Sequence, residues 1–300
     1  MSARVAEVNA LLTTLLAERA GGGRLAVVVR GSGAAAFADA LAAAQPPGAG
    51  VTVGTASPGD VLIHLRGGSG SGDTEQGADV VIDHHDPQWP VIRRVNADLA
   101  DPERWYLSES RAFFGIRAAS WDTRFGDDLP AYAEAVAQAG VRPGDTVLDL
   151  GCGTGRALPA LAGAAGPDGR VLGLDLTPDM VAAARRAGRD RFAALGIADA
   201  RRLPLRDGSV DGVFAAGLVQ HRPDPAAGLA ELARVARPGA RLAIFHPSGR
   251  AALAARHGRT LRPDEPLSDT RLGPLLAAAG WFLTAYQDLP DHFFAAATYS

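Results

Sequence analysis

The sequence predicts an α/β protein in which a smaller α/β domain precedes a larger domain built on a mainly parallel sheet. Short apolar runs typical of buried strands alternate with Ala/Leu-rich stretches of helical spacing. Two of these runs pass into a helix through a glycine-rich turn, at residues 31–33 and 151–155. This alternation places helices on both faces of a parallel sheet, with ligands beyond the carboxyl ends of the strands.

Composition limits the class of partner. The chain has 300 residues, which favours about two domains, and its 47% hydrophobic and 21% charged residues are ordinary for a globular protein. All 30 basic residues are arginine, and the formal net charge is −3. A protein that binds nucleic acid needs a concentrated basic face to neutralise phosphates, so we expect no nucleic-acid partner.

The single cysteine, Cys152, excludes an internal disulfide and favours the cytoplasm. No apolar run reaches the roughly 18 residues needed to cross a bilayer. The first turns of the chain carry Glu7, Glu18 and Arg19 among the leucines, unlike a secretory signal. We therefore expect a cytoplasmic protein with no membrane partner.

Residues 1–100 predict the small α/β domain. Apolar residues at helical spacing indicate a helix over residues 4–20, and a strand over residues 25–30 leads into an alanine-rich helix that ends near Ala44. Shorter strands are expected at residues 51–53, 61–64 and 80–82.

The turn between that strand and helix, Gly31-Ser32-Gly33, has two functional interpretations. The order of elements, continued by residues 78–83 and Asp86-Pro87, resembles the P-loop nucleoside kinases of the uridine kinase type over about residues 5–95. A working P-loop needs a lysine to reach the phosphates, yet the chain contains none and Phe37 follows the alanines. The resemblance therefore implies a degenerate domain without phosphoryl transfer.

The second interpretation is a dinucleotide turn of the type G-x-G-x-x-A. It lacks the ribose-binding acid, because residues 55–57 are Thr-Ala-Ser where the second strand ends. We favour a degenerate domain that packs, forms a homodimer or presents a surface. His84-His85 resembles part of a metal-dependent phosphoesterase signature, but adjacent histidines point to opposite sides of an extended chain, and we expect no metal site.

Residues 101–143 form an aromatic-rich segment between the two domains. Its rings include Phe114, Trp121 and Phe125. Two interpretations stay open: ordinary packing of core helices, or a lid over a neighbouring ligand site. In a lid, the rings would exclude water and contact an apolar substrate.

The strongest pattern begins at residues 147–150, a buried strand that contains Asp149 and runs into Gly151-Cys152-Gly153-Thr154-Gly155 and a helix. Glycines allow turn dihedrals and close approach of a ligand, and the helix offers free N–H groups. The spacing G-x-G-x-G differs from the dinucleotide fingerprint G-x-G-x-x-G/A. It resembles motif I of the class I S-adenosylmethionine (SAM) methyltransferases, and in particular the small-molecule group that includes the ubiquinone/menaquinone-biosynthesis type.

Further motifs of that family follow in order between residues 142 and about 247. Asp175 ends the second strand, Asp199-Ala200 begins the family's Asp-Ala…Leu-Pro segment, and residues 217–225 resemble its segment beyond the fourth strand. The resemblance implies that Asp175 binds the ribose hydroxyls of SAM and that Asp199 and Ala200 bind its adenine. The cofactor-binding residues that it implies are Asp149, Gly151, Gly153, Gly155, Asp175, Leu176, Met180, Asp199, Ala200 and Gly217.

The resemblance implies a Rossmann-like, seven-stranded methyltransferase sheet within residues 144–300, preceded by the aromatic segment as a lid. Apolar patterning predicts its later elements: a weakly marked third strand at 191–197, a fourth entered from residue 207, a helix at 226–236, a strand at 241–245, a helix at 268–279, and an antiparallel pair at 281–286 and 292–298.

The expected function is transfer of a methyl group from SAM to a small molecule, with oxygen slightly favoured as the acceptor atom. His221 and His246 follow strands whose ends face the expected pocket, so either could take the acceptor's proton, and His221 is favoured. Two alternatives stay open. One is a SAM-binding regulatory or partner protein without catalysis, and the other is a nicotinamide-dependent oxidoreductase, which the glycine spacing disfavours.

Overall fold

The computed structural model describes residues 2–20, 25–45, 50–67, 75, 77–219, 225–256, 261 and 265–300, without the side chains of residues 102–104, 125 and 127. The chain divides into two compact units. Unit 1 comprises residues 1–113 and 255–259, and unit 2 comprises residues 114–254 and 260–300. The division falls inside one helix, α3 (Pro102–Ala118). The aromatic-rich segment therefore begins in unit 1 and continues in unit 2.

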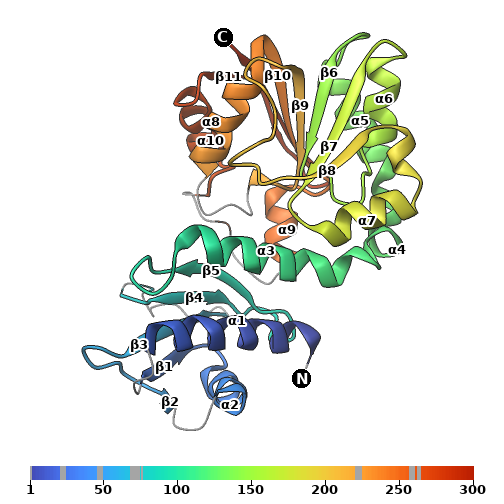
Figure 1. The fold of residues 1–300 in the computed structure, drawn as a ribbon. Coiled ribbons are helices and arrows are strands. Elements are labelled where there is room, and N and C mark those ends of the chain that lie inside the picture. Colours follow the sequence, from blue (N-terminus) through green and yellow to red (C-terminus); the bar gives the residue numbers. More distant parts are fainter. Residues whose placement is uncertain are drawn as a thin grey trace. The chain divides into compact units, whose positions relative to one another are not determined.

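Unit 1 contains a five-stranded sheet of order β2-β1-β3-β4-β5 in the described part of the chain (Figure 1). Its strands are β1 (Ala26–Gly31), β2 (Gly50–Val53), β3 (Val61–Arg66), β4 (Val80–Asp83) and β5 (Val91–Val95), and its helices are α1 (Ala3–Ala20), α2 (Ala34–Ala44) and the first part of α3. Strands β1 to β4 are parallel, whereas β5 pairs antiparallel with β4. Sequence patterning missed β5, because Arg93 and Arg94 interrupt its apolar run.

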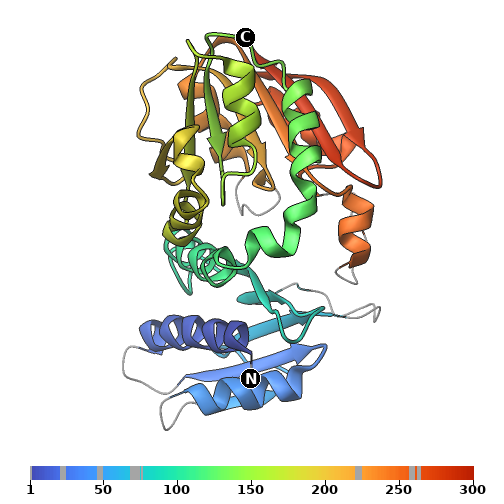
Figure 2. The same cartoon turned by 90° about the vertical axis from the view of Figure 1, so that its right-hand side faces the viewer.

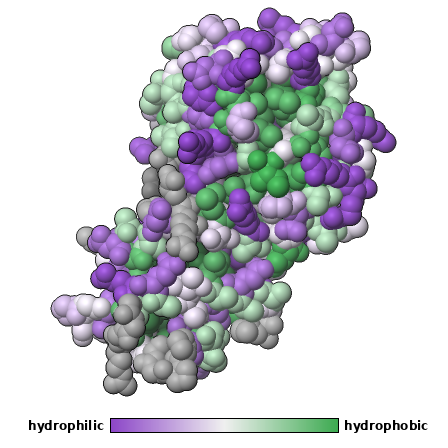
Figure 3. All heavy atoms as spheres, viewed as in Figure 1, coloured by the Kyte–Doolittle hydropathy of each residue, from purple (hydrophilic) through white to green (hydrophobic). Residues whose placement is uncertain are grey.

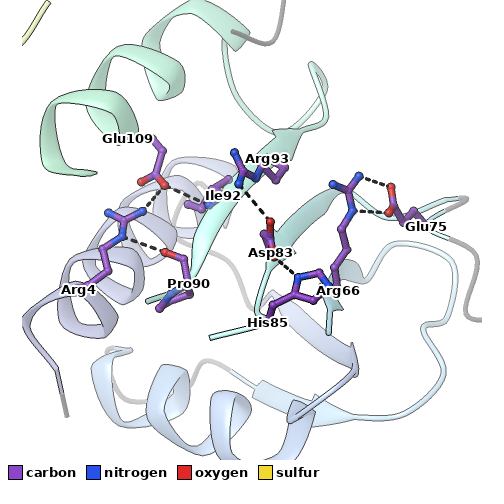
Figure 4. A network of polar contacts seen from close by, with 9 residues as sticks. All are labelled: Arg4, Arg66, Glu75, Asp83, His85, Pro90, Ile92, Arg93 and Glu109. Atoms are coloured by element: carbon purple, nitrogen blue, oxygen red, sulfur yellow. Dashed lines mark hydrogen bonds and ion pairs between the residues drawn. The ribbon is translucent and has the colours of Figure 1, made fainter. Parts of the chain in front are cut away.

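A buried ion pair joins three elements of unit 1 (Figure 4). Arg4 of α1 is fully buried, donates from Nε to the carbonyl oxygen of Pro90 at 2.9 Å, and pairs with Glu109 of α3. The Glu109 carboxylate also accepts the backbone N–H of Ile92 on β5, at 3.1 Å. Such a pair is costly to break from one side only, so it helps to specify how α1, β5 and α3 pack.

Unit 2 contains a seven-stranded sheet of order β11-β12-β10-β9-β6-β7-β8 within its described residues. The strands are β6 (Thr146–Leu150), β7 (Arg170–Asp175), β8 (Ala194–Ile197), β9 (Val210–Ala216), β10 (Ala236–His246), β11 (Trp281–Asp288) and β12 (Phe293–Tyr299). Strands β6 to β10 run parallel, and β12 lies antiparallel between β10 and β11. The predicted α/β fold and the closing antiparallel pair are therefore confirmed.

Helices cover both faces of this sheet (Figure 2). The helices of unit 2 are α4 (Trp121–Phe125), α5 (Leu129–Gln138), α6 (Leu158–Ala165), α7 (Pro178–Arg186), α8 (Pro225–Val235), α9 (Arg250–Arg256) and α10 (Asp269–Ala277), with 3₁₀ turns at Gly126–Asp128 and Arg189–Arg191. Of these, α5 and α6 pack on one face of the sheet and α8 and α10 on the other. Successive strand residues enter opposite cores: Val147 packs with α5 and α6, and Leu148 packs with α8 and α10. This alternation explains why the parallel strands read as continuous apolar runs.

Three elements differ from the sequence prediction. Strand β10 starts at Ala236 rather than at residue 241. The third strand starts at Ala194 rather than residue 191, because Arg189–Arg191 form a 3₁₀ turn. Helix α9 was not predicted, since its seven residues, mostly Ala and Arg, carry almost no apolar periodicity. Among the described helices, none combines the length and the apolar character that a membrane span requires.

Candidate active site

The glycine turn after β6 is held in a left-handed conformation. The φ angles of Gly151, Gly153 and Gly155 are +73°, +55° and +84°, values that side chains other than glycine rarely adopt. The backbone N–H groups of Gly151 and Cys152 both donate to the carbonyl oxygen of Leu174, at 2.8 and 3.1 Å. The turn is thereby anchored to the end of β7 and stays open at Gly153, where an added Cβ would approach only the Met180 sulfur, at 4.0 Å.

Two carboxylates lie beneath this turn. Asp175, at the end of β7, accepts the N–H of Gly153 on Oδ2 and the N–H of Thr177 on Oδ1, both at 2.8 Å. Asp149 is 1% exposed, and its Oδ2 has no hydrogen-bond partner within the described part of the chain. Burial raises the pKa of Asp149 to about 8, and the neighbouring Asp175 carboxylate contributes to the rise. Burial also raises the pKa of Asp175, against the effect of its backbone donors.

A buried carboxylate without a donor is costly, which makes this position suited to a ligand that brings positive charge or N–H groups. SAM carries a sulfonium and an ammonium group. The orphaned Asp149 oxygen and the open space at Gly153 therefore fit the cofactor that the motif implies.

The other predicted cofactor residues lie along the same carboxyl edge of the sheet. Leu176 follows Asp175, and Gly217, with a φ of +64°, donates its N–H to the carbonyl oxygen of Phe245 at 2.8 Å. Ala200 is 7% exposed and follows β8. The Asp199 carboxylate is held by Arg201, whose Nη2 and Nε approach its oxygens at 2.6 to 3.1 Å. Sequence reasoning did not foresee this arginine contact.

An apolar surface adjoins these residues. Ile197, at the end of the edge strand β8, is 52% exposed. Figure 3 shows apolar residues gathered on the visible face of unit 2 around β7 and β8. A surface of this kind suits the flat face of an aromatic base.

The aromatic segment contacts the glycine turn through an acid that sequence reasoning missed. Asp122 of α4 accepts the Thr154 hydroxyl at 2.6 Å and pairs with Nη1 of Arg189 at 2.6 Å. Next to Asp122, the Trp121 ring lies 6.1 Å from the ring of Phe114, between centroids. The Phe125 side chain lies outside the described residues.

Of the two predicted histidines, only His246 is described; His221 lies outside the described residues. His246 ends β10, two strands away from β6 in the sheet. Its Nδ1 is 3.0 Å from the carbonyl oxygen of Ser248. A carbonyl only accepts, so in the neutral ring Nδ1 carries the proton and the basic lone pair lies on Nε2.

Behind the turn, Tyr132 of α5 packs against Phe245, with 5.1 Å between ring centroids, and against the Arg156 guanidinium, at 5.4 Å from its ring. Burial raises the pKa of Tyr132 to about 12, so its hydroxyl stays protonated near neutral pH. Tyr132 therefore has a packing role behind the glycine turn and is not a candidate for the catalytic base.

The glycine turn of unit 1 is filled by its own side chains. Nδ1 of His84 donates to the carbonyl oxygen of Ser32, at 3.1 Å, and a Cβ added at Gly33 would lie 2.9 Å from that ring. The Phe37 ring meets His84 edge-on, with 5.6 Å between centroids. His85, beyond the end of β4, instead pairs with Asp83, so the two adjacent histidines have different partners.

Comparison with known proteins shows what part of unit 2 is similar to. Residues 148–244 match the family described as a methyltransferase domain. Over 119 residues, the chain is 40% identical to a ubiquinone/menaquinone biosynthesis C-methyltransferase, UbiE, of Burkholderia mallei, an alignment that covers 38% of this chain and 47% of the relative.

A second relative, an uncharacterised 37.1 kDa protein in transposon TN4556 of Streptomyces fradiae, is 47% identical over 107 residues, which cover 35% of this chain and 31% of that protein. This chain therefore spans less than half of the length of the curated relatives that it matches. Among solved structures, a chain from the complex of the Haloferax volcanii Trm112 methyltransferase activator with a methyltransferase superposes with a TM-score of 0.52 at 22% identity, over 62% of this chain and 96% of that chain. This likeness supports the fold alone.

Proposed function

We propose that this chain is a SAM-dependent methyltransferase that acts on a small-molecule acceptor. The observation that carries the proposal is the arrangement of Asp149, the left-handed glycine turn and Asp175 inside the stretch that matches the methyltransferase family. A nicotinamide-dependent oxidoreductase fits less well, since the glycine spacing differs from the dinucleotide fingerprint.

The proposed binding roles follow the sequence motifs. Asp175 would accept from the ribose hydroxyls, Asp149 would balance positive charge near the turn, and Asp199 with Ala200 would bind the adenine edge beside the apolar surface at Ile197. Both Asp175 oxygens already accept one backbone N–H each and retain acceptor capacity. When bound, the cofactor supplies an electrophilic methyl group.

The chain's own contribution to catalysis is to hold the acceptor in line with that methyl group and to exclude water. Positioning of this kind lowers a barrier by roughly 7 to 11 kcal/mol at best. For an oxygen acceptor, which we slightly favour, a base would remove the proton. His246 offers a lone pair on Nε2, and His221 is the candidate beyond the fourth strand. The relative named as a C-methyltransferase makes carbon the alternative acceptor atom.

Calorimetry with SAM and S-adenosylhomocysteine (SAH), followed by a methyl-transfer screen of phenols, acids and amines, tests the proposal. We expect one cofactor per chain and turnover of at least one acceptor class. Asp175→Ala should weaken SAM binding by roughly 1 to 3 kcal/mol, the cost of losing charge-assisted hydrogen bonds. Wild-type affinity in that variant would remove Asp175 from the ribose site. Tight SAM binding without methylation of any acceptor would favour the non-catalytic alternative.

For unit 1 we propose a degenerate domain without nucleotide chemistry, which packs, presents a surface or forms a homodimer. Its glycine turn is closed by His84, and the chain has no lysine to reach a phosphate. We also propose a cytoplasmic location, which the single cysteine supports.

A further inference from the structure

Three contacts tie the aromatic segment of unit 2, residues 114–128, to the glycine turn. The Thr154 hydroxyl donates to Oδ1 of Asp122, and Nη1 of Arg189 lies between Oδ2 of Asp122 and the carbonyl oxygen of Thr154. All three distances are 2.6 Å. The pair of Asp122 and Arg189 therefore holds both the side chain and the backbone of Thr154.

The surroundings make this contact more than a surface ion pair. Thr154 is 2% exposed, and the side chains of Arg189 and Asp122 are 13% and 38% exposed. The Arg189 stem also packs on Gly155, where an added Cβ would lie 3.2 Å from its Cδ. Charge-assisted hydrogen bonds in such partly desolvated positions are stronger than exposed ones.

The same segment approaches the next helix of the site. A Cβ added at Gly115, in the last turns of α3, would lie 3.1 Å from the Asp179 carboxylate at the start of α7. Asp122 follows Trp121, whose ring pairs with that of Phe114. The segment thus touches both the glycine turn and the helix that follows Asp175, the two places where the donor should bind.

We propose that Asp122 is a positioning residue that holds the aromatic segment, residues 114–128, against the glycine turn. We call this contact the latch and the segment the lid. Docking of the lid and binding of the methyl donor are then coupled. The coupling rests on the proposed function, since it requires SAM to bind at the turn. Asp122 acts through Thr154 and Arg189, which set the conformation of the turn, and it need not touch the donor itself. By linkage, a donor that stabilises the turn must stabilise the docked lid by the same factor.

Hydrogen exchange of the full-length protein, with and without SAH, tests the latch. In the wild type, amides of residues 114–128 should be protected and should become more protected when SAH binds. Asp122→Asn keeps the shape but removes the charge, so it should speed exchange in this segment already without cofactor. It should also weaken SAH binding by about five- to thirtyfold, the effect of losing one or two charge-assisted hydrogen bonds.

Thr154→Val is the second variant, because it removes the hydroxyl and leaves the ion pair. It should act in the same direction, and the double variant should lose less than the sum of the two. Asp128→Asn is the matched control: it makes the same charge change in the same segment, and the described residues show no ion pair there. Its SAH affinity should equal that of the wild type.

Wild-type exchange in cofactor-free Asp122→Asn would overturn the latch. Wild-type SAH affinity in that variant, with only a lower melting temperature, would assign Asp122 a structural role and overturn the coupling. If the wild type itself fails to bind SAH, the proposed function fails and the coupling fails with it, whereas the cofactor-free exchange data still decide whether the latch exists.

Discussion

At the scale of single residues, the pair Asp149 and Asp175 determines how the site should respond to pH. Burial raises the pKa of Asp149 to about 8, so without a bound ligand this carboxyl group keeps its proton over most of the neutral range. A cationic ligand favours the ionised carboxylate. Binding of SAM should therefore release a proton, and its affinity should rise with pH below that pKa.

We expect the SAM dissociation constant to fall by up to about tenfold per pH unit between pH 5.5 and 7.5, the limit for one coupled proton. Asp149→Asn should bind more weakly and without this slope. Calorimetry in buffers of different ionisation enthalpy measures the released proton directly. An affinity independent of pH in the wild type would mean that Asp149 is already ionised or does not face the ligand.

The same shift affects stability. A carboxyl whose pKa is higher in the folded than in the unfolded chain stabilises the fold below its unfolded pKa, and this contribution is lost as pH rises toward 8. Asp149→Asn should accordingly gain in melting temperature relative to the wild type as pH increases from 5 to 8.5 in the absence of cofactor. Parallel curves for the two proteins would contradict the assigned pKa.

The two histidines can be separated by kinetics. If the acceptor is an oxygen that must lose a proton, replacing the true base should lower kcat by about 100-fold to 10,000-fold, with SAM affinity changed only a few-fold. His221→Ala and His246→Ala should be compared across pH, where only proteins that keep the base should show activity that rises with pH. Full turnover in both variants would indicate a nitrogen, carbon or already ionised oxygen acceptor.

At the scale of elements, two glycines with positive φ separate the cost of backbone strain from the cost of a steric clash. A Cβ at Gly31 would overlap the backbone carbonyl oxygen of Leu65 on β3, whereas Gly59, also with positive φ, has nothing within 4 Å. Both Gly→Ala variants carry the conformational cost of about 1 kcal/mol or more. Gly31→Ala must in addition separate β1 from β3, so it should destabilise unit 1 by about 2 kcal/mol more.

Hydrogen exchange of β1 and β3 amides in urea measures this difference without requiring the whole chain to unfold in one step. Gly59→Ala is the control for backbone strain alone. Equal exchange in the two variants would show that the sheet of unit 1 can accommodate the added methyl group.

At the scale of the whole molecule, the glycine turns of the two units differ in whether a side chain of the protein occupies the space beside them. In unit 2 the turn is open above Asp149, whereas in unit 1 the His84 ring lies against Gly33. We expect no ATP binding or hydrolysis by the full-length protein, and none in His84→Ala, because removing the ring does not supply the missing lysine. Hydrolysis above a blank that Gly33→Val abolishes would restore a nucleotide role for unit 1.

The sequence by itself determined the features that depend on neighbours along the chain. Glycine spacing located the turn at 151–155, apolar runs located the parallel strands, and acids placed directly after strands, such as Asp175, marked the ligand edge. These signals can be read from the sequence because the dihedral preference of glycine and the periodicity of apolar residues are local properties of a segment.

Only the tertiary structure decided which side chains meet. The contact of Asp122 with Thr154 spans 32 residues, and that of His84 with Ser32 spans 52. The orphaned oxygen of Asp149 depends on how β6 is buried between its neighbours, and the polar strand β5 exists because β4 offers an edge to pair with. Such partners are selected by packing of distant segments, which leaves no periodic trace in the sequence.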